Sequence, residues 1–268
     1  MKPLSVGNVV STGLRIYRDN FKKYFTLAFF GYLWILVPIY GLAKFSAMTG
    51  IISRLAFKEV AEQPETVRDA QRYVNPRMWS FLIAGILVGL ILFGAIIPYS
   101  LIMVIALGIA GALSNRSSFG VLGTVVISLV SVAAILLFIF GIIWLFSKLF
   151  LVELPLAIEE NANATNTIKR SWQLTKGAVG RIQIIVFLVF LISLPIGIAI
   201  NILSVVLQLI IGTALENNSA LAGIGYLLYI VFVLGASAFI LPLWQSVKAV
   251  IYYDLRVRRE GMGIDLRK

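Results

Sequence analysis

The chain has 268 residues, of which 60% are hydrophobic and 13% are charged, and its formal net charge is +11. A soluble domain this apolar would lack enough polar surface to cover itself, so the composition excludes an ordinary water-soluble protein. The sequence contains neither cysteine nor histidine, which removes disulfides, thiolate metal sites and the commonest general base. No cluster of acids and bases gathers at one depth of the apolar stretches. We therefore expect a membrane protein that is not an enzyme and that holds no cofactor.

The apolar residues form stretches longer than the roughly 20 residues needed to cross a hydrocarbon core about 30 Å thick. In lipid the backbone must satisfy its own hydrogen bonds, and the alternating pattern of barrel strands is absent, so these stretches are predicted to be helices. The expected fold class is an all-α integral membrane protein, one polytopic domain over residues 1–268. We expect about six transmembrane helices and two amphipathic interfacial helices.

The chain begins with an amphipathic segment at residues 5–22, in which apolar residues recur at helical spacing opposite a basic face. This pattern predicts a helix in the membrane interface, with Ser5 as its N-cap. A first span is expected at residues 24–45, with a kink at Pro38. Residues 46–76 carry both acids and bases and are predicted to be an extramembrane segment with a short surface helix.

Two long apolar stretches occupy the middle of the chain. Residues 78–113 carry no charge and would measure about 54 Å as a straight helix, so they exceed one crossing and the sequence leaves one or two crossings open. Residues 119–158 are interpreted as two spans joined by a tight turn near residues 138–141. A second amphipathic segment at residues 163–176 precedes the last two spans. These are expected at residues 182–212 and 221–253.

The lysines and arginines predict the orientation of the chain. With six spans, both termini share one side with most of the 23 basic residues, so the positive-inside rule predicts a multi-pass protein with both termini in the cytoplasm. The two amphipathic segments each precede a proline-containing apolar stretch. Residues 5–45 therefore resemble residues 163–212, and an internal duplication and a chance similarity both stay open.

Several short motifs resemble one known family. Pro155–Glu159 (PLAIE) and Lys169–Gly177 (KRSWQLTKG) look like the glycerophosphoryl diester phosphodiesterase membrane-domain family, and Tyr252–Gly261 and Pro3–Gly7 support this resemblance. It implies a six-span membrane module, found alone or fused to a phosphodiesterase barrel, whose stand-alone members have no known function. The enzymatic activity is not implied, because the chain has no histidine and lacks the roughly 250 residues of a barrel.

Charged residues near the ends of apolar stretches are the first candidate site. Lys148 and Glu153 flank an apolar turn, and the best interpretation is an ion pair of Glu153 with Lys148 or Lys248 near the cytoplasmic interface. A proton or solute relay is the functional hypothesis. A snorkelling lysine and an interhelical ion pair are the structural hypothesis, which we favour.

Polar residues within the expected fifth span are the second candidate. Asn201, Ser204 and Gln208 share one face of a helix. They could line a polar path, but hydrogen bonding between helices is the favoured interpretation. Gln245 and Lys248, one turn apart in the last span, are their expected partners.

Two further features concern contacts with other molecules or helices. Bases and an aromatic residue at the interface could dock lipid headgroups or a partner protein, although positive-inside anchoring explains them equally well. These residues are Arg170, Trp172, Arg256, Arg258 and Arg259. Gly85 and Gly89 form a G-x-x-x-G spacing, which favours packing inside the bundle over dimerisation.

The leading functional hypothesis is a non-enzymatic membrane module that acts in envelope organisation or assembly. Its expected partners are membrane lipids or another membrane protein. Nucleic acid is not expected, because the bases lie at helix ends with no aromatic reading surface. The alternative is a transporter or channel for a small solute or lipid, which the proline-containing spans and the duplication would favour.

Overall fold

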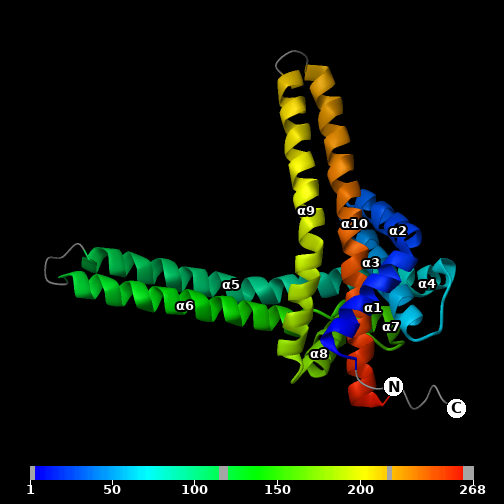
Figure 1. Ribbon diagram of the computed structural model, residues 1–268, viewed down its shortest axis with the longest axis horizontal. Coiled ribbons are helices and arrows are strands. Elements are labelled where there is room, and N and C mark those ends of the chain that lie inside the picture. The colour runs from blue at the N-terminus through cyan, green and yellow to red at the C-terminus, as the bar shows by residue number, and fades with distance from the viewer. Residues whose placement is uncertain (1–3, 115–119, 216–218, 262–268) are drawn as a thin grey trace.

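Two long helical hairpins diverge from one polar base (Figure 1). The computed structural model describes residues 4–114, 120–215 and 219–261, and these residues form helices and no strand. One hairpin consists of α5 (Met78–Ser114) and α6 (Gly120–Leu149), and the other of α9 (Val179–Leu215) and α10 (Ser219–Glu260). We call the remaining helices, together with the adjoining ends of these four, the base.

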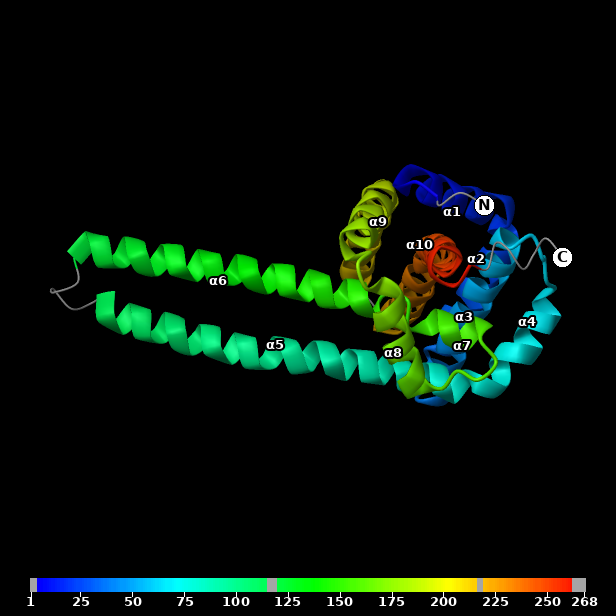
Figure 2. The ribbon, with the colours of Figure 1, turned by 90° about the horizontal axis from the view of Figure 1, so that it is seen from below.

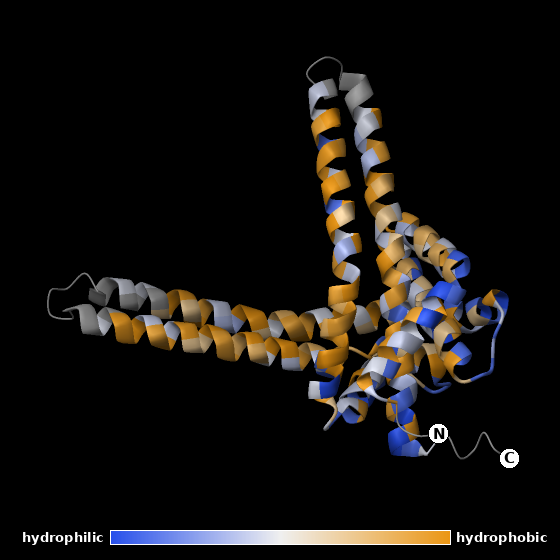
Figure 3. Cartoon of the chain, viewed as in Figure 1, coloured by the Kyte–Doolittle hydropathy of each residue, from blue (hydrophilic) through white to orange (hydrophobic). Residues whose placement is uncertain are grey.

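The hairpins consist mostly of hydrophobic residues (Figure 3). Leu137 and Phe140 of α6 are 74% and 70% exposed, and such side chains need lipid rather than water around them. Among the described residues, four helices are long and apolar enough to cross a membrane. The chain is therefore an all-α protein with the character of a multi-pass membrane protein, and the expected count of six spans is not reached in this part of the chain.

The predicted turn near Phe138 is wrong, because α6 runs as one helix through it. Phe138 instead packs inside the hairpin, where its ring stacks on Tyr99 with centroids 3.7 Å apart. The Tyr99 hydroxyl donates a hydrogen bond to the Ala134 carbonyl at 2.6 Å. Likewise α5 is one continuous helix with Pro98 inside it. An apolar run with no polar turn residue gives the backbone no reason to leave the helix in lipid.

The predicted first span is also wrong, because the chain turns back between α2 (Phe21–Trp34) and α3 (Tyr40–Val60). With 14 residues, α2 is about 21 Å long, too short for a hydrocarbon core of about 30 Å. Pro38 lies in the turn, where its missing N–H and its effect on the preceding residue favour chain reversal over a kink. Gly41 is required here, since a Cβ atom would lie 1.7 Å from the Trp34 carbonyl oxygen.

Helix α3 belongs to the core of the base, so the surface helix predicted within residues 46–76 is wrong, whereas the extramembrane location of this region stays a prediction. Ile51, Ile52 and Leu55 are buried, and α3 packs against α10. The prediction failed because α3 has an apolar face that α10 covers, and the charged residues of this region lie outside that face. Helix α4 (Val67–Val74), capped by the Thr66 side chain, then leads through a 3₁₀ turn, η1 (Asn75–Arg77), into α5.

The lower part of α10 lies at the centre of the base, as the end-on view in Figure 2 shows. Helix α1 (Val6–Asp19) crosses it so closely that a Cβ atom on Gly13 would lie 2.6 Å from Val247 Cγ2. Helices α7 (Glu153–Ile158) and α8 (Ala164–Thr175) complete the base. Both predicted amphipathic helices therefore exist, and Ser5 caps α1 as predicted. Their apolar faces cover protein, however, rather than lying directly on lipid.

Candidate functional site

The structure pairs Glu153 with Lys248, on α7 and α10. Their Oε1 and Nζ atoms are 2.6 Å apart, and Lys248 also lies over the Phe150 ring at 5.0 Å from its centroid. Both side chains are about a fifth exposed, at 24% and 18%. This ion pair joins the start of α7 to the second hairpin close to the point where the hairpins diverge.

Lys148 has different partners from those expected. Its ammonium group lies beside two indole rings that contact each other, 5.7 Å from the Trp144 centroid and 5.5 Å from that of Trp172. Its backbone carbonyl accepts a hydrogen bond from the Ser171 hydroxyl at 2.7 Å. Lys148 therefore joins α6 to α8 through cation–π contacts, and Glu153 takes the other lysine.

The polar residues of α9 do not meet their expected partners. Gln208 donates to the Tyr229 hydroxyl, whereas Asn201 and Ser204 lie further down the same hairpin, exposed and half-buried. Gln245 lies in the base, where its Oε1 accepts a hydrogen bond from Ser53 Oγ of α3 at 3.0 Å. The expected partnership of the stripe with Gln245 and Lys248 is therefore wrong, because the stripe faces the upper part of α10.

A cavity of about 330 Å³ lies where the first hairpin, α3 and α10 meet. Aromatic and aliphatic side chains form most of its wall, and Glu153, Gln245 and Lys248 form what we call its polar end; Ser46 and Thr49 are the other polar lining residues. The apolar lining residues are Phe45, Phe81, Ala84, Gly85, Val88, Phe146, Leu149, Phe150, Val152 and Leu241. The site therefore combines an apolar chamber with a small set of polar groups, the usual make-up of a ligand site.

Gly85 and Gly89 do not pack closely against another helix, in contrast to the expectation from their spacing. A Cβ atom at either position would find no atom within 4 Å. Gly85 lines the cavity, whereas Gly89 lies one turn further along α5 and does not line it.

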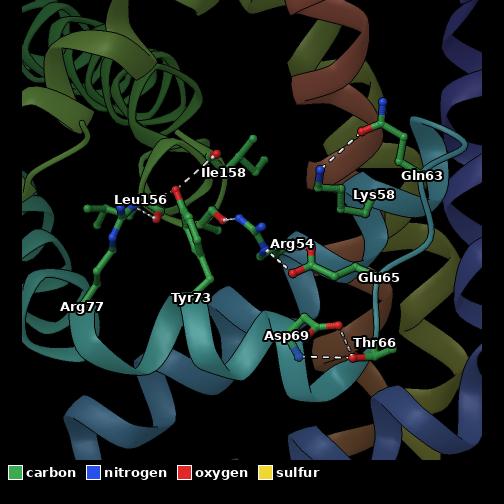
Figure 4. A network of polar contacts seen from close by, with 11 residues as sticks. Arg54, Lys58, Gln63, Glu65, Thr66, Asp69, Tyr73, Arg77, Leu156 and Ile158 are labelled. Atoms are coloured by element: carbon green, nitrogen blue, oxygen red, sulfur yellow. Dashed lines mark hydrogen bonds and ion pairs between the residues drawn. The ribbon is translucent and has the colours of Figure 1, made fainter. Parts of the chain in front are cut away.

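A second polar cluster holds the end of α7 (Figure 4). The guanidinium groups of Arg54 and Arg77 lie over the Tyr73 ring, 3.7 and 4.3 Å from its centroid. Arg54 also pairs with Glu65 at 2.9 Å and donates to the Ala157 carbonyl. Arg77 donates to backbone carbonyls at the end of α7 and just beyond it, among them that of Glu159 at 2.8 Å. Cations at a helix C-terminus complement its free carbonyls and its dipole, so this cluster stabilises α7.

The expected docking arginines are occupied inside the protein. Arg170 lies between Glu159, at 2.9 Å, and Glu260. Burial works against the charge of Arg170, but the hydrogen bonds that it donates to both carboxylates, together with their negative charges, outweigh burial and raise the pKa of this guanidinium. Arg256 pairs with Glu260 at 2.8 Å, and Arg259 donates to the Lys176 carbonyl.

Asp254 anchors the N-terminal segment to the end of α10. This carboxylate is 4% exposed. It accepts the Leu4 backbone N–H at 2.8 Å and pairs with Arg181 at 2.9 Å and Arg258 at 2.8 Å. Arg258 also donates to the Leu4 carbonyl at 2.9 Å. Of the expected docking residues, Trp172 is the one that keeps an exposed apolar surface, at 39%.

Sequence reasoning missed Ser53, Tyr73 and Asp254. Ser53 and Tyr73 lie within residues 46–76, which were predicted to be extramembrane, so no packing partner was predicted for them. The i, i+4 spacing of Tyr73 and Arg77 is a local signal that could have revealed half of the cluster. Arg258 lies four residues after Asp254 and is a local signal of the same kind, but no local pattern points to Leu4 and Arg181, which are far away in the sequence.

No protein-family model matches the chain, and the comparisons with curated proteins and with solved structures also give no match.

Proposed function

We propose that this protein is a non-enzymatic membrane module that binds lipids and acts in envelope organisation or assembly. The observation that carries the proposal is the division of the molecule into two hairpins with exposed apolar sides and one base held together by ion pairs. The charged groups of the base are used to join helices. The resemblance to the membrane module of the phosphodiesterase family is part of this proposal.

The lengths of the hairpins support an intimate contact with lipid. Helices α5 and α9 have 37 residues each, so each is about 55 Å long. A helix of this length at a tilt of about 45° spans about 39 Å, close to the full bilayer thickness with its interfaces. Two hairpins that diverge from one base (Figure 1) both lie in one bilayer when they tilt in opposite directions. In this arrangement both termini lie with the base on the cytoplasmic side.

The basic face of α1 is the proposed contact with anionic headgroups. Arg15 and Arg18 of α1 are exposed, as is Lys22 at the start of α2, and Arg18 pairs with its neighbour Asp19. Each base near an anionic membrane surface contributes about 1 kcal/mol. This face replaces the tail arginines as the docking candidate, because those are engaged in the base.

The test is gentle extraction of the tagged protein with its surrounding lipid, followed by mass spectrometry of retained lipids and proteins. An unrelated multi-span protein is the baseline. We expect enrichment of anionic lipid, reduced in the double variant Arg15→Gln/Arg18→Gln. The matched control is Arg68→Gln/Arg72→Gln, which removes the same charge from the exposed face of α4.

Three results would contradict the proposal. Equal lipid retention in both double variants would remove the role of α1. A solute flux in reconstituted vesicles that is lost in Gln208→Leu would instead support a transporter. A stoichiometric protein that co-purifies without enriched lipid would shift the partner from lipid to another membrane protein.

A further inference from the structure

We propose that the 330 Å³ cavity between α3, α5, α6 and α10 holds part of one zwitterionic phospholipid, with a phosphate and an ammonium group at its polar end. The inference rests on the proposed function and names the lipid class that the base selects. It is separate from the anionic contact of α1, because different residues and a different headgroup carry it.

The position of the cavity gives a lipid access from the bilayer. Gly85 and Phe146 line it and are also exposed on the surface of the first hairpin. On the opposite side, Gln245 is buried at 3% exposure against α3. An acyl chain can therefore enter from the lipid-facing side while the headgroup stays close to the base.

The apolar wall fits an acyl chain. Phe81, Phe150 and Leu241 contribute to a lining that is mostly aromatic and aliphatic. The methylene groups of an acyl chain can pack against such a wall without leaving a polar atom unpaired. The volume lies near the lower end of the roughly 300–1,000 Å³ range of small-molecule sites. It accommodates a segment of one lipid rather than the whole molecule.

The charges at the polar end select the headgroup. Glu153 and Lys248 carry opposite charges 2.6 Å apart, so the site is neutral overall. An ammonium group can approach Glu153 while a phosphate accepts from Lys248, and each charge then meets its opposite. A headgroup with only a negative charge would lie beside the Glu153 carboxylate without a compensating cation.

Gln245 adds hydrogen-bond donors to this end. Its oxygen accepts a hydrogen bond from the Ser53 hydroxyl at 3.0 Å. The two amide N–H groups are then left as donors for a ligand in the cavity, which Gln245 lines. Phosphate oxygens are strong acceptors for such groups. The Ser53 contact holds the Gln245 side chain against α3.

Gly85→Leu is the decisive variant, because it fills the cavity without disturbing the protein. A Cβ atom at Gly85 meets no atom within 4 Å, and the same holds for Gly89 one turn along α5. Gly89→Leu is therefore a matched control with the same chemical change outside the cavity. Both variants replace glycine within a helix by a better helix former, so neither is expected to impair folding.

The experiment uses the full chain in nanodiscs made of equal amounts of phosphatidylethanolamine and phosphatidylglycerol. Native mass spectrometry after release into mild detergent counts the lipids that stay bound. We expect one retained phosphatidylethanolamine on the wild-type chain and on Gly89→Leu. Occupancy should fall about tenfold in Gly85→Leu, which corresponds to about 1.4 kcal/mol of binding free energy.

A second variant tests the choice of headgroup. Glu153→Gln leaves the positive charge of Lys248 without its carboxylate, so retention should shift toward phosphatidylglycerol by about tenfold. Circular dichroism of the purified variant confirms that it is folded. The headgroup readout is a ratio of two lipids on the same molecules, so a change in yield does not affect it.

Three outcomes would overturn the inference. They are a wild-type chain that retains phosphatidylglycerol in preference, a wild-type chain that retains neither lipid, and equal retention by the two leucine variants. The proposed function fails differently, through equal anionic-lipid enrichment in the Arg15→Gln/Arg18→Gln and Arg68→Gln/Arg72→Gln proteins. The two tests share no substituted residue.

Discussion

The base and the hairpins are built on different principles. In the base, large side chains such as Leu151 and Tyr252 are fully buried, and ion pairs join residues far apart in the chain, as Asp254 does with Arg181. In the hairpins, Leu137 and Phe140 are mostly exposed. The base therefore specifies the fold through individual contacts, whereas a hairpin needs length, apolarity and a few contacts between its two helices.

The glycines show the same difference. In the base, a Cβ atom on Gly13 would lie 2.6 Å from a Val247 methyl group, and one on Gly41 would overlap the Trp34 carbonyl. In the hairpins, a Cβ atom on Gly94 or Gly141 meets nothing within 4 Å. Gly13 and Gly41 permit a close approach of backbone and neighbouring atoms, whereas Gly94 and Gly141 face open surface that lipid can fill.

Removal of the Asp254 carboxylate should have the largest effect. Asp254→Ala leaves Arg181, Arg258 and the Leu4 N–H without their shared acceptor. Breaking a buried pair from one side costs about 3–5 kcal/mol, and we expect about 3 kcal/mol because both arginines are partly exposed. Thermal unfolding in detergent measures the loss, and limited proteolysis should show earlier cleavage at the released N-terminus.

The control for Asp254 is an exposed carboxylate with one arginine partner. Asp19→Ala removes an ion pair with Arg18 whose side chains are 51% and 79% exposed, so its effect should stay below about 1 kcal/mol. Equal stability of the two variants would contradict the assignment of Asp254 as the anchor of the N-terminal segment.

Overpacking at the crossing of α1 and α10 should have an intermediate effect. The methyl group of Gly13→Ala would push on Val247, whose Cα atom lies 3.1 Å from the added Cβ and belongs to the rigid core of α10. We expect a loss of about 1–3 kcal/mol of unfolding free energy. Denaturant titration of the purified protein measures it.

The same substitution in a hairpin is the matched control. Gly141→Ala adds a methyl group in open space, and alanine is the better helix former by up to about 1 kcal/mol. Its stability should be unchanged or slightly higher. A loss at position 141 as large as at position 13 would show that the hairpin is packed against something the isolated chain lacks.

Much of the fold could be predicted from the sequence because lipid imposes a simple rule on the backbone. The helical class, the amphipathic segments and the Ser5 cap all follow from local patterns that the structure reproduces. The number of crossings could not be predicted in this way. Residues 24–43 and 121–147 are both uncharged apolar runs, yet the first turns back between α2 and α3 and the second lies within one 30-residue helix, α6. What separates them is whether tertiary contacts cover the helix.

The candidate site was only partly accessible to sequence reasoning. Glu153 and Lys248 are recognisable because charges beside apolar stretches need partners, but the choice between Lys148 and Lys248 depends on how α10 enters the base. The lining of the cavity comes from four separate stretches of the chain. Ser53 holds Gln245 by a hydrogen bond from α3, which was expected outside the membrane. The two residues are 192 positions apart, so no sequence pattern predicts this contact.

Loss of a single hydroxyl within a hairpin should have the smallest effect. Tyr99→Phe removes the hydrogen bond to the Ala134 carbonyl at 2.6 Å and keeps the ring stacked on Phe138. Hydrogen bonds between membrane helices contribute about 0.6 kcal/mol on average, and the Ala134 carbonyl keeps a helical partner in any case. Unfolding by denaturant in mixed micelles should therefore show a change below about 1 kcal/mol. Tyr99→Ala, which also removes the stacked ring, should cost more, and the difference between the two variants isolates the aromatic contact. A loss in Tyr99→Phe comparable to that in Asp254→Ala would contradict the division into a base that specifies the structure and hairpins that chiefly require apolar length.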